Sequence, residues 1–202
     1  MIKAVLFDAD GVLFEATELH RVSLNQALAK YGYTITDEEH FSFYNGLPTK
    51  VKLEQLTKDK GLPKCLHEEI EQLKQDITLE EIPKIIVPNQ QIIQALQFLK
   101  DKEVICGICS NAREKSVYRM AVAGDIAHFF KIILGNECVA NNKPAPDIYL
   151  YGAKLIEIPI AECAIVEDSP NGLKAAYAAN PGIVLKVRNP HDVKIELFKE
   201  VI

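Results

Sequence analysis

The stretch AVLFDADGVLF, residues Ala4–Phe14, places two aspartates directly after a short apolar run. Ala4–Asp8 is apolar up to its last residue, which is typical of a buried strand that ends at a charge. In open α/β sheets, ligands bind beyond the carboxyl ends of the strands. Asp8 and Asp10 therefore stand where such a fold would bind a ligand, although an isolated Asp-x-Asp pair is more often a solvated turn.

Further apolar segments follow this first strand, and helical patterns separate them along the chain. These predicted strands lie at residues 104–111, 129–135, 163–169 and 182–187. Strands and helices that alternate at this spacing predict an α/β fold, with a Rossmann-like parallel sheet and helices on both of its faces.

Residues 15–88 differ from the rest of the chain because they carry helical patterns and no convincing strand. We therefore predict a core of residues 1–14 and 89–202, interrupted by an all-helical insertion at residues 15–88. The length of 202 residues fits one domain with a sizeable insertion.

Composition and charge narrow the class of protein. The net charge is −5, and the basic residues are spread along the chain, which argues against a nucleic-acid partner. No apolar run approaches the roughly 18 residues that cross a bilayer, and the N-terminus lacks the layout of a signal peptide. Five cysteines without disulfide-like spacing predict a reduced, cytoplasmic protein.

Cys106 and Cys109 form a C-x-x-C pair, for which a redox or a zinc role is an alternative. No second pair of cysteines or histidines stands at zinc spacing. The pair lies in the apolar segment VICGIC, so we predict that both are core residues, because free cysteine is among the most buried residue types.

Polar residues end or follow the next three predicted strands, as the two aspartates follow the first. They are Ser110 and Asn111 at the end of the second strand, Lys143 in the loop after the third, and Glu167 and Asp168 at the end of the fourth. Parallel strands bring these loops to one edge of the sheet, so we expect one shared site.

The chemistry of that site can be built from its residue types. Converging carboxylates raise one another's pKa unless a cation balances them, and Mg²⁺ suits a few carboxylates, waters and a substrate phosphate. Lys143 and the Ser110 hydroxyl suit phosphoryl oxygens. One carboxylate can attack phosphorus and the other can move a proton, which predicts phosphoryl transfer through an aspartyl-phosphate.

These motifs and their order resemble the haloacid dehalogenase superfamily, and within it the β-phosphoglucomutase-like phosphatases. Asp8-x-Asp10-Gly11-Val12 is similar to the first motif of that family. The resemblance implies that Asp8 is the nucleophile and that Asp10 is the acid/base, with the Asp10 backbone carbonyl also on the metal. Dehalogenases of the superfamily lack the second aspartate, so its presence indicates a phosphatase or a phosphomutase.

The remaining motifs match by the same resemblance. Ser110 corresponds to the second motif, Lys143 in KPAPDIY to the third, and Glu167-Asp168 in VEDSPNG to the fourth. The implied metal is Mg²⁺, with Asp168 and Glu167 as ligands beside the first-motif aspartates. Asn111 is a predicted substrate contact.

The resemblance also implies a helical cap domain that selects the substrate. We expect His20 and the loop NGLPTKVK, with Gly46 and Lys50, to contact the substrate, and Lys52 and Lys74 are alternatives for an anionic group. The competing interpretation is that His20 and these lysines are ordinary surface residues.

The predicted function is a Mg²⁺-dependent phosphatase for a small phosphorylated metabolite such as a sugar phosphate. A phosphosugar mutase is the alternative, although Thr49-Lys50 stands where true mutases of this group carry an arginine. A non-catalytic sensor of phosphorylated metabolites is a third candidate. Such a sensor is expected to have lost a motif residue, and none has been lost here. We expect a monomer that binds neither nucleic acid nor membranes.

Overall fold

The computed structural model describes residues 1–44 and 47–202. The chain divides into two compact units, one made of Met1–Ala16 with Ile86–Ile202, and the other of Thr17–Ile85. The divisions lie within three residues of the predicted insertion bounds, and the strands all belong to the first unit.

The first unit is built on a five-stranded parallel sheet in the order β3-β2-β1-β4-β5. Its strands are β1 (Ala4–Phe7), β2 (Ile105–Cys109), β3 (Phe130–Leu134), β4 (Cys163–Glu167) and β5 (Ile183–Lys186). Every pair of neighbours is parallel, which confirms the predicted α/β fold. The central strand β1 is buried along its whole length, as a sheet covered on both faces requires.

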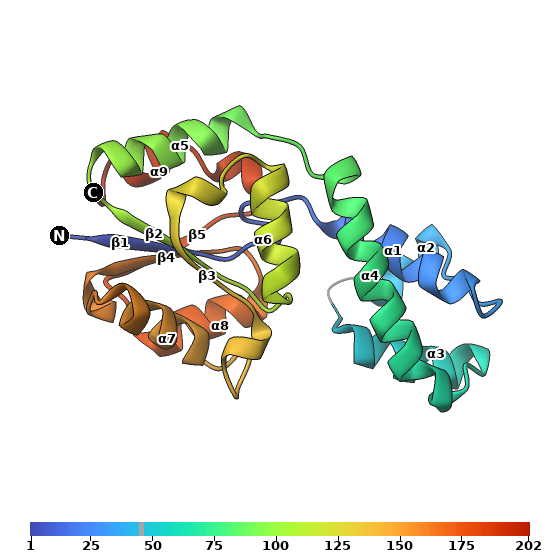
Figure 1. Cartoon of the computed structure of the whole chain (residues 1–202). Helices are drawn as coiled ribbons and strands as arrows, with labels where there is room; N and C mark the ends of the chain where they lie inside the picture. The colour runs from blue at the N-terminus through green and yellow to red at the C-terminus, as the bar shows by residue number, and fades with distance from the viewer. Residues whose placement is uncertain (45–46) are drawn as a thin grey trace. The chain divides into compact units, whose positions relative to one another are not determined.

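Helices cover both faces of this sheet (Figure 1). On one face lie α5 (Gln90–Asp101), α6 (Glu114–Ala123) and α9 (Ile195–Phe198); on the other lie α7 (Asp147–Ile156) and α8 (Pro170–Ala179). The change of face follows from right-handed crossovers, because the chain first winds from β1 toward β3 and then returns to the other side of β1.

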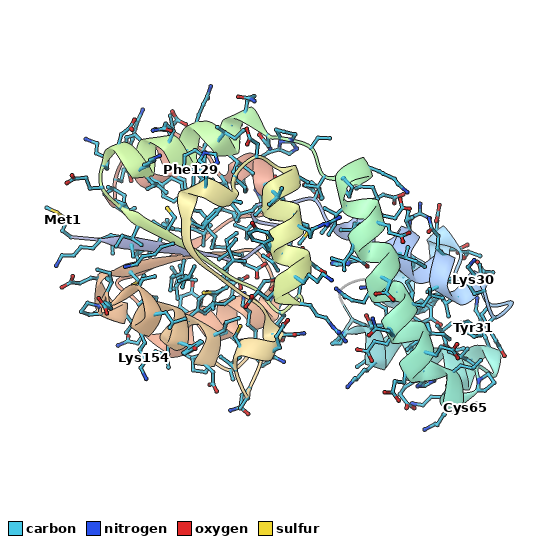
Figure 2. The ribbon with its side chains drawn as sticks, viewed as in Figure 1. Met1, Lys30, Tyr31, Cys65, Phe129 and Lys154 are labelled. Atoms are coloured by element: carbon cyan, nitrogen blue, oxygen red, sulfur yellow. The ribbon has the colours of Figure 1, made fainter. Side chains whose placement is uncertain are left out.

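Between the sheet and α7 with α8 lies one tightly packed group of buried side chains. Leu6, Ile165, Ile148, Tyr149 and Ala175 belong to it. Figure 2 shows side chains filling the space between the sheet and its helices, whereas the charged end of Lys154 points outward. Tyr149 packs its ring into this largely apolar group, whereas its hydroxyl donates a hydrogen bond to Glu167.

The second unit contains helices and no strand among its described residues. It contains α1 (Thr17–Ala29), α2 (Asp37–Glu39), α3 (Thr49–Lys60) and α4 (His67–Ile85). A core of its own joins these helices, with Leu24 and Leu28 from α1, Leu53 and Leu56 from α3, and Ile70 from α4. A separate apolar core explains why this insertion forms a compact unit.

Cys106 and Cys109 are buried in β2 and are not disulfide-bonded, which confirms the prediction that they are core residues. Within residues 1–44 and 47–202, no helix combines the length and apolar character needed to span a membrane. The cytoplasmic location and the monomeric state stay predictions.

Candidate active site

The candidate site lies where the strand order reverses, beyond the carboxyl ends of β1 and β4. Phe7 pairs with Val166 on β4 and with Ile108 on β2, so the residue after β1 reaches the sheet edge beside the ends of both neighbours. The Asp8 N–H continues the ladder by donating to the Val166 carbonyl at 3.0 Å. The register thus places Asp8 at the centre of the edge, as its predicted role needs.

Asp10 and Gly11 follow in a tight turn. The N–H of Gly11 donates to the Phe14 carbonyl at 2.8 Å, and the N–H groups of Leu13 and Phe14 both donate to the Ala9 carbonyl. Gly11 has a φ of +83°, in the left-handed region that favours glycine. This turn holds Asp10 two residues beyond Asp8 at the same edge of the sheet.

Lys143 lies between two carboxylates. Its Nζ lies 2.5 Å from Asp8 Oδ1 and 2.6 Å from Glu167 Oε1. The lysine side chain is only 3% exposed, so water contributes little to solvating its charge. The structure therefore brings together the residues of the first, third and fourth motifs through direct ion pairs.

Ser110 and Asn111 directly follow β2, and Asn111 meets the Lys143 loop. The Asn111 Oδ1 accepts from the Lys143 N–H at 3.0 Å, and its Nδ2 donates to the Lys143 carbonyl at 3.2 Å. The Ser110 Oγ is buried and accepts from the Ala112 N–H at 3.0 Å. Asn111 thus holds the backbone of the lysine loop, and a contact between its amide and the substrate stays a prediction.

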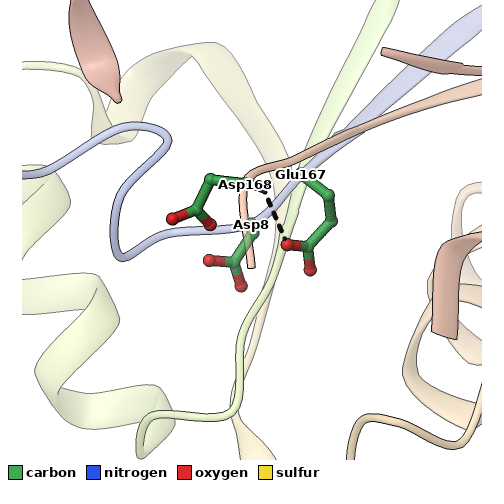
Figure 3. A group of neighbouring side chains, drawn as sticks. All are labelled: Asp8, Glu167 and Asp168. Atoms are coloured by element: carbon green, nitrogen blue, oxygen red, sulfur yellow. Dashed lines mark hydrogen bonds between the residues drawn. The ribbon is translucent and has the colours of Figure 1, made fainter. Parts of the chain in front are cut away.

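Three carboxylates could hold a metal ion. Asp8, Glu167 and Asp168 each offer one oxygen, and these oxygens lie within 4.8 Å of one another. In Figure 3 the Asp8 and Asp168 carboxylates lie on one side, and the Glu167 side chain leaves on the other and turns one carboxylate oxygen back toward them. No donor among the described residues reaches the buried Oδ1 atom of Asp168, as expected of an oxygen that binds a cation.

The pKa values of the carboxylates reflect this crowding. Burial raises the pKa of Asp8 to about 8, and Lys143 opposes this rise while Glu167 and Asp10 add to it. Burial, followed by the charge of Glu167, raises the pKa of Asp168 to about 6. Burial lowers the pKa of Lys143, but attraction to Asp8 and Glu167 outweighs it, so the pKa is raised overall. One lysine leaves an excess of negative charge that a divalent cation would balance.

The predicted substrate contacts of the insertion lie in the second unit. His20 is half-buried on α1 and Lys50 is exposed on α3. Gly46 lies outside the described residues. The loop pattern did not separate Lys52 from Lys50, but Lys52 is buried on α3. Burial, followed by the charge of Lys74, lowers the pKa of Lys52 to about 8.

Tyr149 and Gly172 belong to the site although their motifs gave them no role. The Tyr149 hydroxyl donates to Glu167 Oε1 at 2.6 Å. A Cβ atom on Gly172 would overlap the Glu167 carboxylate. Both residues stand inside the motif segments KPAPDIY and VEDSPNG, so proximity in sequence was the available signal.

The family model of the haloacid dehalogenase-like hydrolases matches residues 5–185. The chain therefore belongs to that family, as its motifs predicted.

Curated relatives and solved structures agree with this membership. Over 184 residues the chain is 25% identical to a phosphorylated carbohydrates phosphatase of Thermotoga maritima, covering 88% of this chain and 82% of that one. It is 26% identical to a β-phosphoglucomutase of Bacillus subtilis, covering 98% and 95%. A structure of a CbbY variant from Rhodobacter sphaeroides in complex with xylulose-(1,5)bisphosphate shares the fold, with a TM-score of 0.80 and 23% identity over 95% of this chain and 89% of that one.

Proposed function

We propose that this protein is a Mg²⁺-dependent phosphatase that hydrolyses a small phosphorylated carbohydrate through an aspartyl-phosphate on Asp8. The observation that carries the proposal is the ion pair between Lys143 Nζ and Asp8 Oδ1, beside the unpartnered Oδ1 of Asp168. A nucleophile, a cation for the phosphoryl group and a metal-ligand oxygen thus share one sheet edge.

The residues present fit a magnesium ion. Asp8 and Asp168 would hold it through carboxylate oxygens, and the Asp10 carbonyl is the further ligand that the family resemblance implies. Bound there, the ion would neutralise charge on the phosphoryl oxygens in the transition state. The raised pKa values of Asp8 and Asp168 support this assignment, because hard carboxylate ligands in excess need a counter-ion.

The reaction then follows from the chain's own groups. Asp8 attacks phosphorus, the bond from phosphorus to the leaving oxygen breaks, and Asp10 gives that oxygen a proton. Asp10 next takes a proton from water, which attacks the aspartyl-phosphate and releases phosphate and free Asp8. Lys143 orients the Asp8 carboxylate and, with the Ser110 hydroxyl, stabilises charge on the transferring group.

A phosphorylated carbohydrate is the substrate class that the relatives favour. One is named a phosphatase of phosphorylated carbohydrates, and CbbY was captured with a sugar bisphosphate. His20 and Lys50 stay the predicted contacts for the sugar or for a second anionic group.

The β-phosphoglucomutase relative, matched over nearly its whole length, favours a phosphosugar mutase as the second candidate. The two functions differ in the fate of the phosphoryl group. A phosphatase releases it to water, whereas a mutase returns it to a phosphosugar and needs a bisphosphate primer.

The deciding experiment measures phosphate release from a panel of phosphorylated metabolites, with Mg²⁺ and with EDTA, for wild type and Asp8→Asn. The proposal predicts metal-dependent release that falls at least about 10³-fold in Asp8→Asn, because the nucleophile is gone. Substantial release by the variant contradicts the mechanism. Isomer interconversion with a bisphosphate primer, and little free phosphate, would assign the mutase instead.

A further inference from the structure

Tyr149 is a fully buried residue of α7 whose hydroxyl points to the site rather than into the apolar core. The hydroxyl donates to Glu167 Oε1 at 2.6 Å, and Lys143 Nζ lies 4.7 Å from the centroid of the phenol ring. A buried hydroxyl is stable only with a hydrogen-bond partner. One side chain therefore contacts both members of the Lys143–Glu167 ion pair.

Protein donors contact both oxygens of the Glu167 carboxylate. Its Oε1 accepts from Lys143 Nζ and from the Tyr149 hydroxyl, each at 2.6 Å. Its Oε2 accepts from the Asp168 N–H at 3.1 Å and has longer contacts, each at 3.4 Å, with the N–H and the hydroxyl of Ser169. A carboxylate has about four lone-pair sites, so these donors compete with a metal ion for Glu167, most strongly at Oε1.

The local backbone makes this arrangement possible. Successive residues of an extended strand point to opposite sides, so Glu167 and Asp168 separate at the end of β4. Figure 3 shows this separation, with the Asp168 N–H bonded back to Glu167. Gly172 in α8 leaves room for the Glu167 carboxylate, because a Cβ atom there would overlap it.

We infer that Tyr149 is a positioning residue, which with Glu167 sets the Lys143 ammonium against Asp8, and that Glu167 serves as this anchor rather than as a direct metal ligand. The inference rests on the proposed function for its catalytic consequence. Two of the three ammonium donors are used by Asp8 and Glu167, so the direction of the third is fixed and it stays available to a phosphoryl oxygen.

Tyr149→Phe tests the hydroxyl alone, because the ring and its packing remain. With 4-nitrophenyl phosphate as the probe, kcat is expected to fall about tenfold while KM stays within about twofold. Tyr151→Phe is the matched control, since Tyr151 lies on the same helix, is 37% exposed and makes no side-chain hydrogen bond with the described residues. Wild-type kcat in Tyr149→Phe, or an equal loss in the control, overturns the positioning role.

Mg²⁺ binding measured by calorimetry tests the Glu167 assignment independently of turnover. Glu167→Gln should bind Mg²⁺ within about threefold of wild type, whereas Asp168→Asn should lose at least tenfold in affinity. Equal losses in the two variants would make Glu167 a metal ligand and overturn the assignment.

The Lys143 ammonium signal in nitrogen-15 NMR, assigned with Lys143→Arg, provides a second measurement without turnover. It should shift in Tyr149→Phe and stay unchanged in Tyr151→Phe, and an unchanged signal in both overturns the inference. An inactive wild type would refute the proposed phosphatase, and these two binding and NMR measurements would still decide the roles of Glu167 and Tyr149.

Discussion

Gly11 lies so close to Asp168 that a Cβ atom at position 11 would overlap the Asp168 carboxylate. The absence of a side chain at Gly11 therefore leaves space for Asp168, the proposed metal ligand of the fourth motif. The positive φ of +83° at Gly11 is a second, separate reason for glycine at this position.

Gly11→Ala is expected to weaken Mg²⁺ binding at least about tenfold and to lower kcat, because the new methyl group displaces Asp168. Calorimetry and phosphate release measure the two effects. Gly32→Ala is the matched control: Gly32 has a φ of +79°, and a Cβ atom there would meet nothing within 4 Å. Both variants should lose about 1 kcal/mol of stability from left-handed backbone strain, so a metal defect shared by both would contradict this explanation.

Asp10→Asn should keep the nucleophile and remove the group that moves the proton. General acid–base groups contribute roughly 10²–10⁴-fold to a rate, so kcat is expected to fall by about that factor. With an ester of a very acidic leaving group the loss should be smaller, because that leaving oxygen needs no proton. An equal loss with good and poor leaving groups would argue against the acid role, and circular dichroism would establish that the variant folds.

Mg²⁺ affinity should rise with pH. The metal-free protein holds protons on Asp168 up to a pKa of about 6 and on Asp8 up to about 8, and these protons must leave before the oxygens bind a cation. Titration calorimetry in buffers of different ionisation enthalpy should therefore detect proton release near pH 6 that fades above pH 8.

The same pKa shifts determine how the stability of the metal-free protein changes with pH. The folded metal-free protein keeps these protons longer than the unfolded chain does, so the contribution of the two groups to stability falls as pH rises from about 4 to 8. Stabilisation by Mg²⁺ should accordingly grow over that range. A thermal shift with Mg²⁺ that is independent of pH would contradict the predicted protonation of the site.

Lys52→Met should stabilise the protein at neutral pH. Burial, then repulsion from Lys74, lowers the pKa of Lys52 from 10.5 to about 8, and His40 is a further group coupled to its charge. The folded state thus loses a proton that the unfolded chain retains to higher pH. The resulting penalty is complete below about pH 8 and disappears toward pH 10.5.

The expected gain for Lys52→Met is roughly 3 kcal/mol at pH 7, because the pKa falls from 10.5 to about 8 and each pKa unit is worth about 1.4 kcal/mol. It should shrink toward zero near pH 10.5, as measured by denaturation of both proteins at each pH. Lys50→Met is the matched control, since Lys50 is exposed on the same helix and surface changes stay within about 0.5 kcal/mol. Equal effects of the two substitutions would show that burial of Lys52 is not the cause.

The sequence alone determined the alternation of strands and helices, the helical insertion after the first strand, and the four motifs that follow strand ends. These features are readable because they are local: apolar periodicity marks each element, and the charged residue that ends a buried strand stands next to it. The sequence also predicted that the site lies at the carboxyl ends of the strands, because parallel strands bring these ends to one edge of the sheet. Asp8, Lys143 and Asp168 could be selected on that basis without coordinates.

Only the tertiary structure decided which partners these residues have. The local sequence pattern does not say whether Glu167 contacts Lys143 and Tyr149 or a metal ion. Its partners depend on how α7 and α8 pack beside β4. Burial of Lys52 rather than Lys50 likewise depends on how the surrounding chain packs on α3. Hydrogen-bond partners and burial are properties of segments distant in sequence, and folding alone brings those segments together.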